Sequence, residues 1–197
     1  GNAADAAVAT ALALAVVYPQ AGNLGGGGFA IWVEPGKYPE TLDFREVAPS
    51  GYTANLYLDD DGEVVKTRSL VTPLAVGVPG SPLGLFELYK KHGSKDVSWA
   101  KLCESAIRLA EDGFTVDPWL AAMLKRTEIA LLLRADPGGA ELFYPNGQPL
   151  KAGDRLVQPR LAQTLRIYAA QGPEGFYKGA VARAILRDLE DADERAG

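Results

Sequence analysis

The sequence predicts an α+β fold with several helices and two or more β-hairpins. An apolar helical stretch opens the chain, a glycine run then leads into residues of high β propensity, and helical patterns dominate the second half. The 197 residues are 47% hydrophobic and 23% charged, which is ordinary for a globular protein.

The first helix is expected over residues 3–17, with Asn2 as its N-cap and an end just before Pro19. Small residues lie on all its sides, so we expect protein to surround it on most sides and the chain to pack at least two layers. The stretch contains Asp5 and is shorter than the ~20 residues that cross a bilayer, so no membrane span is predicted.

Two hairpins should follow this helix. Residues 29–33 and residues 41–45 are predicted to pair around Pro35-Gly36, and residues 57–65 are predicted to form a second hairpin around an acidic turn. That turn lacks the ligand spacing of a calcium loop, so it is interpreted as a solvated reversal.

Arg45 is the first candidate for a ligand contact. In its strand Leu42 and Phe44 alternate with Asp43 and Arg45, so a period of two puts the arginine on a polar face that is exposed or lines a site. From the residues alone Arg45 either holds a small anion or pairs with Asp43 or Glu46 on the sheet.

The glycine run at residues 25–28 nearly fits a dinucleotide-binding fingerprint, but here a helix precedes the run and a strand follows it, the reverse of what that motif requires. We interpret the run as a close-packed turn with positive φ.

Helical patterns fill the rest of the chain, interrupted by turns at residues 136–139 and 145–147 around a short segment at 142–144, and by a separator at 175–179. The acidic end, residues 190–195, is expected to fray. The predicted helices cover residues 82–92 with Ser81 as the cap, 98–111, 117–133, a stretch that begins at Pro159, and 180–189.

The net charge and the small number of cysteines and histidines exclude several classes of function. A net charge of -5 without a basic stripe argues against nucleic acid as a partner. A single cysteine and a single histidine allow no intrachain disulfide and no structural zinc site, and no metal or cofactor is predicted. Cys103 is interpreted as a small core residue and His92 as a surface cap at a helix end, so neither is assigned chemistry. No targeting signal is visible.

Several segments together resemble the γ-glutamyltranspeptidase (glutathione hydrolase) family, in the family's order and spacing across essentially the whole chain. They are GNAADAAVA at residues 1–9, GGGGF at 25–29, LDFREVAP at 42–49, VGVPGS at 76–81, PLKxGDxLVQP at 149–159 and FYxG at 176–179.

The resemblance implies an N-terminal-nucleophile hydrolase with a four-layer αββα sandwich, made as a proenzyme that cuts itself into two subunits. Residues 1–197 would be a single incomplete domain, a portion of the large subunit truncated at both ends. The partner would be a small subunit from the same precursor, whose N-terminal threonine is the nucleophile. The chain alone is therefore expected to be inactive and to self-associate through uncovered apolar surface. The resemblance also implies a periplasmic or extracellular location.

The resemblance implies that Arg45 binds the α-carboxylate of γ-glutamyl substrates such as glutathione, and Glu46 is interpreted as support for Arg45. A guanidinium offers two parallel donors to a carboxylate, which fixes both the position and the orientation of the substrate. Two alternatives remain: a related acylase acting on glutaryl or cephalosporin-type amides, and a non-catalytic binding or structural domain on the same scaffold.

Overall fold

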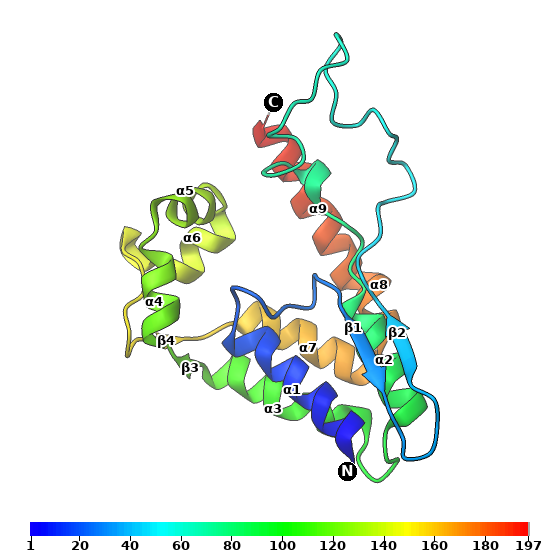
Figure 1. Ribbon diagram of the computed structural model, residues 1–197. Helices are drawn as coiled ribbons and strands as arrows, with labels where there is room; N and C mark the ends of the chain where they lie inside the picture. Colours follow the sequence, from blue (N-terminus) through cyan, green and yellow to red (C-terminus); the bar gives the residue numbers. More distant parts are fainter. Residues whose placement is uncertain (197) are drawn as a thin grey trace. The chain divides into compact units, whose positions relative to one another are not determined.

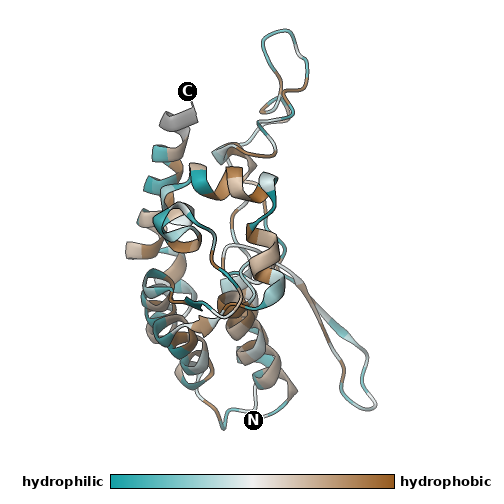
Figure 2. Cartoon of the chain, turned by 90° about the vertical axis from the view of Figure 1, so that its left-hand side faces the viewer, coloured by the Kyte–Doolittle hydropathy of each residue, from teal (hydrophilic) through white to brown (hydrophobic). Residues whose placement is uncertain are grey.

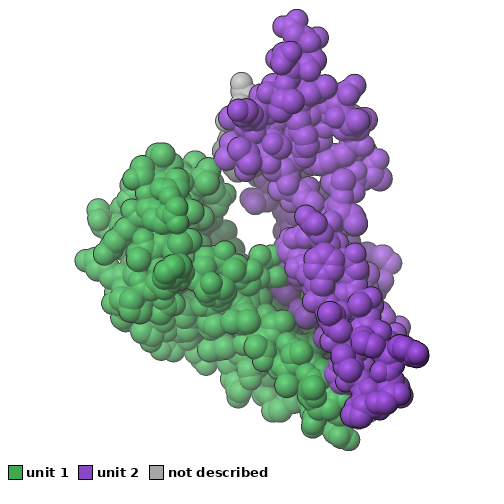
Figure 3. Space-filling model, viewed as in Figure 1, with its two compact units in different colours: residues 1–23, 93–170 green, residues 24–92, 171–197 purple. Residues whose placement is uncertain are grey.

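The computed structural model of this protein describes residues 1–196, and it confirms a helix-rich chain with small sheets (Figure 1). The chain divides into two compact units, which Figure 3 colours separately. Unit 1 contains Gly1–Asn23 and Gly93–Ala170, and unit 2 contains Leu24–His92 and Gln171–Gly197. The expectation of a single incomplete domain stays a prediction.

Unit 1 is mainly helical. It contains α1 (Ala3–Val17), α3 (Trp99–Asp112), β3 (Phe114–Thr115), α4 (Pro118–Leu124), α5 (Thr127–Ala135), α6 (Pro137–Phe143), the 3-10 turn η2 (Pro145–Gly147), β4 (Arg155–Leu156) and α7 (Pro159–Gln171).

Helix α1 packs along α3 and begins with a reciprocal cap. The Asn2 side chain accepts the N–H groups of Ala4 and Asp5, while the Asp5 carboxylate accepts the N–H of Asn2 at 2.9 Å. The predicted bounds of this helix are confirmed. The prediction that protein surrounds it on most sides is wrong within the described chain, because α1 buries one stripe that includes Val8 and Leu12 and leaves Leu14 43% exposed.

The part of unit 1 from β3 to β4 folds around an apolar cluster that includes Leu120, Tyr144 and Leu156. Asp117 caps α4, so a helix starts where it was predicted, but the predicted helix over 117–133 is broken at Lys125. Helix α6 stands where turns and a short segment were predicted, since the Asp136 carboxylate accepts the Gly139 N–H and starts a helix there.

Unit 2 contains β1 (Phe29–Trp32), β2 (Glu40–Asp43), the 3-10 turn η1 (Pro73–Ala75), α2 (Ser81–His92), α8 (Pro173–Tyr177) and α9 (Gly179–Ala196). Strands β1 and β2 form the first predicted hairpin, antiparallel with Phe29 opposite Asp43. A long loop connects β2 to α2 (Figure 1).

The second predicted hairpin is present in a minimal form, with an antiparallel bridge between Leu58 and Val64. Backbone hydrogen bonds join Val65 to Tyr57 at 2.8 Å and Asp59 to Glu63 at 2.9 Å, and the Asp59 carboxylate also accepts the N–H groups of Asp61 and Glu63. Two other predictions in unit 2 need correction. The predicted separator at 175–179 contains the end of α8, and α9 continues to Ala196 where fraying was expected.

Several helices carry both hydrophilic and hydrophobic residues (Figure 2). Within residues 1–196, no helix combines the length and the apolar character that a membrane crossing requires.

Candidate functional site

A groove with a volume of about 390 Å³ lies in unit 2 beside the end of β2. The end of β2 with the residues after it forms one wall, and the Pro79 turn with the first half of α2 forms the other. Its charged lining residues are Asp43, Arg45 and Glu87, and the half-buried Tyr177 of α8 completes it.

Arg45 lies just beyond β2, exposed and at this groove. The Arg45 backbone N–H donates to the Asp43 carboxylate at 3.0 Å. Asp43 therefore bonds to the backbone of Arg45 and forms no ion pair with its guanidinium. Among the described residues no carboxylate lies within 4.0 Å of the Arg45 guanidinium. The sheet ion pair with Asp43 or Glu46 is therefore not formed, and the guanidinium faces solvent with its donors available.

The backbone that carries Arg45 is fixed on both sides. Before it, Phe44 and Gly28 exchange two backbone hydrogen bonds, at 3.0 and 3.3 Å. After it, Val47 and Val78 form an antiparallel bridge, at 2.8 and 3.4 Å. A side chain with a fixed backbone loses less conformational entropy when it holds a ligand.

Glycines make the close packing around Phe44 possible. A Cβ atom at Gly27 would lie 2.5 Å from the Phe44 carbonyl oxygen, and one at Gly80 would lie 1.8 Å from the same oxygen. A Cβ at Gly84 would lie 2.1 Å from Cγ of the Phe44 ring. The glycine run is thus close-packed as predicted, but the expected positive φ is wrong, because residues 25–28 all have negative or extended φ.

Glu46 is exposed, and no hydrogen bond or ion pair is found between its carboxylate and the Arg45 guanidinium. The Glu46 Cβ lies 3.0 Å from where a Cβ of Gly77 would be, so Glu46 passes close to the backbone that precedes Val78. Its support of Arg45 stays a prediction.

Sequence reasoning missed Tyr177 as part of this site. Its hydroxyl donates to the Pro79 carbonyl at 2.6 Å and accepts the Leu83 N–H at 3.3 Å. Burial raises the pKa of the Tyr177 phenol, so the hydroxyl stays protonated. The aromatic pair in the FYxG segment was the only signal in the sequence.

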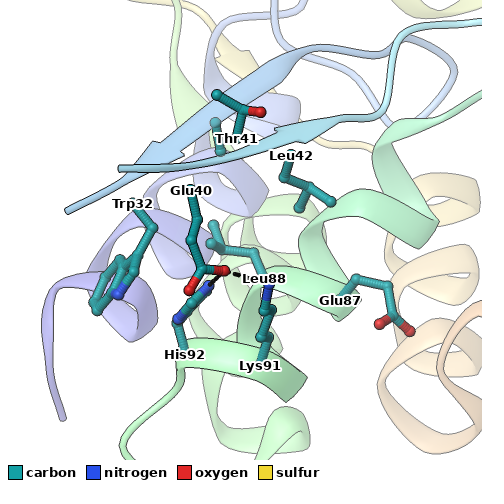
Figure 4. A pocket seen from close by; sticks show the side chains of 9 residues that line it. Trp32, Glu40, Thr41, Leu42, Glu87, Leu88, Lys91 and His92 are labelled. Atoms are coloured by element: carbon teal, nitrogen blue, oxygen red, sulfur yellow. Dashed lines mark hydrogen bonds and ion pairs between the residues drawn. The ribbon is translucent and has the colours of Figure 1, made fainter. Parts of the chain in front are cut away.

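A second hollow of about 120 Å³ lies between the hairpin and the end of α2 (Figure 4). The His92 ring stacks on Trp32 with 4.7 Å between centroids, and His92 Nε2 lies 3.7 Å from the Glu40 carboxylate. The His92 side chain is only 10% exposed, so the predicted surface cap is wrong. Glu40 also pairs with Lys91, whose hydrogen bond lowers the pKa of the Glu40 carboxyl. These contacts anchor the hairpin to α2.

Cys103 is fully buried in α3, and burial raises the pKa of its thiol to about 12. The prediction of a core cysteine is confirmed. Among residues 1–192, whose side chains are described, His, Cys, Asp and Glu form no group of three that could hold a metal ion.

The known proteins similar to this chain match it over nearly its whole length. A family model described as gamma-glutamyltranspeptidase matches residues 1–195. The glutathione hydrolase proenzyme of Pseudomonas sp. (strain A14) is 47% identical over 96% of this chain and 32% of its own length. The chain spans about a third of the length of the curated relatives it matches.

Solved structures are also similar to this chain. The γ-glutamyltranspeptidase of Helicobacter pylori superposes with a TM-score of 0.91 at 40% identity, covering 96% of this chain and 54% of that one. A cephalosporin acylase from Bacillus halodurans superposes with a TM-score of 0.77 at 29% identity, covering 96% of this chain and 35% of that one.

Proposed function

Because the chain belongs to the γ-glutamyltranspeptidase family, we propose that residues 1–197 are the substrate-binding portion of the large subunit of a γ-glutamyl hydrolase or transferase. The predicted fold class, a share of an N-terminal-nucleophile hydrolase αββα sandwich, is confirmed by the likeness to solved γ-glutamyltranspeptidases. The proposed substrates are glutathione and other γ-glutamyl amides. The proposed location is periplasmic or extracellular.

The observation that carries this proposal is the Arg45 guanidinium, exposed at a groove without a carboxylate partner and mounted on a backbone held from both sides. Such a group suits an α-carboxylate, which accepts two parallel hydrogen bonds from one guanidinium. Binding at that end orients the γ-carbonyl for attack and leaves the bond breaking to other groups. Glu46 is proposed to support Arg45 when substrate is bound.

The proposed partner is a small subunit cut from the same precursor. Its N-terminal threonine would supply the nucleophile and its α-amine the base. Residues 1–197 produced alone are then expected to hydrolyse no γ-glutamyl anilide. Measurable hydrolysis by the pure isolated chain, abolished by Arg45→Ala, would overturn this proposal.

The test of Arg45 uses the enzyme processed from the complete precursor. Arg45→Lys keeps the charge but loses the paired donors, so KM for a γ-glutamyl anilide should rise about tenfold or more with a smaller change in kcat. Arg126→Lys is the matched control, because Arg126 is also exposed but pairs with Glu128. An unchanged KM in Arg45→Lys would contradict the proposed role.

The likeness to a cephalosporin acylase keeps a second candidate, an acylase for glutaryl or related amides. A γ-glutamyl group carries an α-amino group beside the carboxylate that Arg45 would bind, and a glutaryl group lacks that amino group. Glutamate binding that is lost in Arg45→Lys favours the γ-glutamyl enzyme, and equal binding of glutarate and glutamate favours the acylase. Binding of neither by the processed protein would favour a non-catalytic domain.

A further inference from the structure

The Tyr177 hydroxyl joins parts of unit 2 that are far apart in the sequence. It bonds to Pro79 and Leu83, which precede it by 98 and 94 residues. The Leu83 N–H belongs to the first turn of α2, where backbone donors have no partner within the helix. A phenol hydroxyl both donates and accepts, so this one atom fixes the turn before α2 and the start of α2 together.

The segment that Tyr177 bonds to, residues 79–83, and the next residue of α2 pack against Phe44, directly before Arg45. Gly80 meets the Phe44 carbonyl, Gly84 meets the Phe44 ring, and neither contact leaves room for a methyl group. The Gly26 carbonyl accepts the N–H groups of both Gly80 and Ser81 at 2.9 Å, which ties the same turn to the glycine run. A displacement of residues 79–83 would therefore move Phe44, and Arg45 with it.

We propose that Tyr177 is a positioning residue for the γ-glutamyl reaction, acting through the Pro79–Leu83 turn and Phe44 to set the orientation of the Arg45 guanidinium toward the substrate α-carboxylate. This inference rests on the function proposed above. Tyr177 need not touch the substrate, since its contacts act on the wall of the groove.

The test compares Tyr177 with Tyr144, because the hydroxyl of each donates a hydrogen bond to a backbone carbonyl. Tyr144 also donates to a backbone carbonyl, that of Leu124 at 2.7 Å, and burial raises its pKa as well, but it belongs to the apolar cluster of unit 1. Both Tyr177→Phe and Tyr144→Phe should lower the melting temperature of the processed enzyme. Only Tyr177→Phe should raise KM for a γ-glutamyl anilide, by about threefold to tenfold, with kcat within about twofold of wild type.

A double-mutant cycle separates positioning from general loosening. In an Arg45→Lys background the paired donors are already lost, so adding Tyr177→Phe should change KM by less than about twofold. Replacement of Tyr177 by p-aminophenylalanine keeps a donor on the same ring and should restore KM to near the wild-type value. Full additivity with Arg45→Lys, or no rescue by the amine, would overturn the proposal.

Failure of this inference can be distinguished from failure of the proposed function. If Arg45→Lys raises KM but folded Tyr177→Phe does not, only the role of Tyr177 is wrong. If Arg45→Lys itself leaves KM unchanged, the proposed function fails. Should Tyr177→Phe not fold, Gly84→Ala breaks the same series of contacts at Phe44, with Gly51→Ala, where a Cβ meets nothing within 4 Å, as its control. An unchanged KM in Gly84→Ala would then overturn the proposal.

Discussion

Two side chains able to carry chemistry, the Cys103 thiol and the Arg45 guanidinium, lie in opposite surroundings. Cys103 has no exposed surface, and burial in an apolar environment disfavours its thiolate. Arg45 is exposed and beside a groove, and the carboxylate of Asp43, two residues before it, accepts the Arg45 backbone N–H. The environment thus excludes Cys103 as a nucleophile and leaves Arg45 able to bind an anion.

Cys103 should not react with thiol reagents while the chain is folded. A pKa of about 12 leaves only about one thiol in ten thousand ionised at pH 8, and the thiolate is the reactive form. We expect 5,5'-dithiobis(2-nitrobenzoic acid) to label native protein at least about a hundredfold more slowly than protein in urea. Equal rates with and without urea would show that Cys103 is accessible.

The sequence was sufficient to put Arg45 on a polar face and Cys103 on a core stripe, because both follow from local periodicity. It was not sufficient to place His92, which is a helix-end residue by sequence but stacks on Trp32 of another element. Nor could it show that Tyr177 reaches the turn before α2. Periodicity assigns a side chain to a face, and only the fold decides what lies opposite that face.

At the scale of elements, the best-predicted features are those whose causes are local. Caps at Asn2, Ser98 and Asp117 start helices where the sequence predicted them. Longer-range features were missed. The β3–β4 pair joins Phe114 to Leu156, and no turn in the sequence near either strand indicates this pairing. The acidic turn reverses the chain as predicted, and the Asp59 carboxylate accepts the N–H groups of Asp61 and Glu63 within it.

The cap of α1 should make stability depend on pH. A hydrogen bond from the Ser94 side chain is the largest cause of the lowered pKa of Asp5, and the N–H groups of Asn2 and Ser94 add to it against the effect of burial. A carboxyl with a depressed pKa in the folded state stabilises above its unfolded pKa, and that stabilisation is lost as pH falls through the folded value.

Asp5→Asn should therefore lower the free energy of unfolding by about 1–2 kcal/mol at pH 7. The difference from wild type should shrink as pH falls below the ordinary Asp value of 3.8. Urea denaturation at a series of pH values measures both effects. Asp60→Asn makes the same charge change at an exposed turn and should have little effect. A difference that persists unchanged to pH 2 would contradict the role of the carboxylate.

At the scale of the whole chain, apolar surface remains uncovered on the hairpin. Phe29, Ile31 and Val33 share the face of β1 opposite Trp32, and they are 66%, 70% and 61% exposed. In the described residues β1 and β2 pair only with each other, so both outer edges also lack partners. Exposed apolar strands with open edges favour association.

Residues 1–197 alone should thus self-associate, and Ile31→Lys should weaken association by about tenfold or more, since burial of an isoleucine contributes roughly 1.5–3 kcal/mol. Light scattering after size exclusion over a concentration series provides the measurement. Leu131→Lys alters an equally exposed residue, 68%, on α5 and is the control. A monomer at every concentration, or equal effects of both variants, would count against the hairpin as the associating surface.

The contacts of Tyr177 also set an order of events during synthesis. A chain leaves the ribosome N-terminal end first, at about 5–20 residues per second. The hairpin and α2 are complete by His92, but the start of α2 lacks its hydroxyl partner until a residue 94 positions later has emerged. Each unit is likewise assembled from two separated stretches of chain. The groove beside Arg45 therefore cannot be completed before residue 177 has emerged, and a ribosome stalled before that point would carry Arg45 without the support of Tyr177.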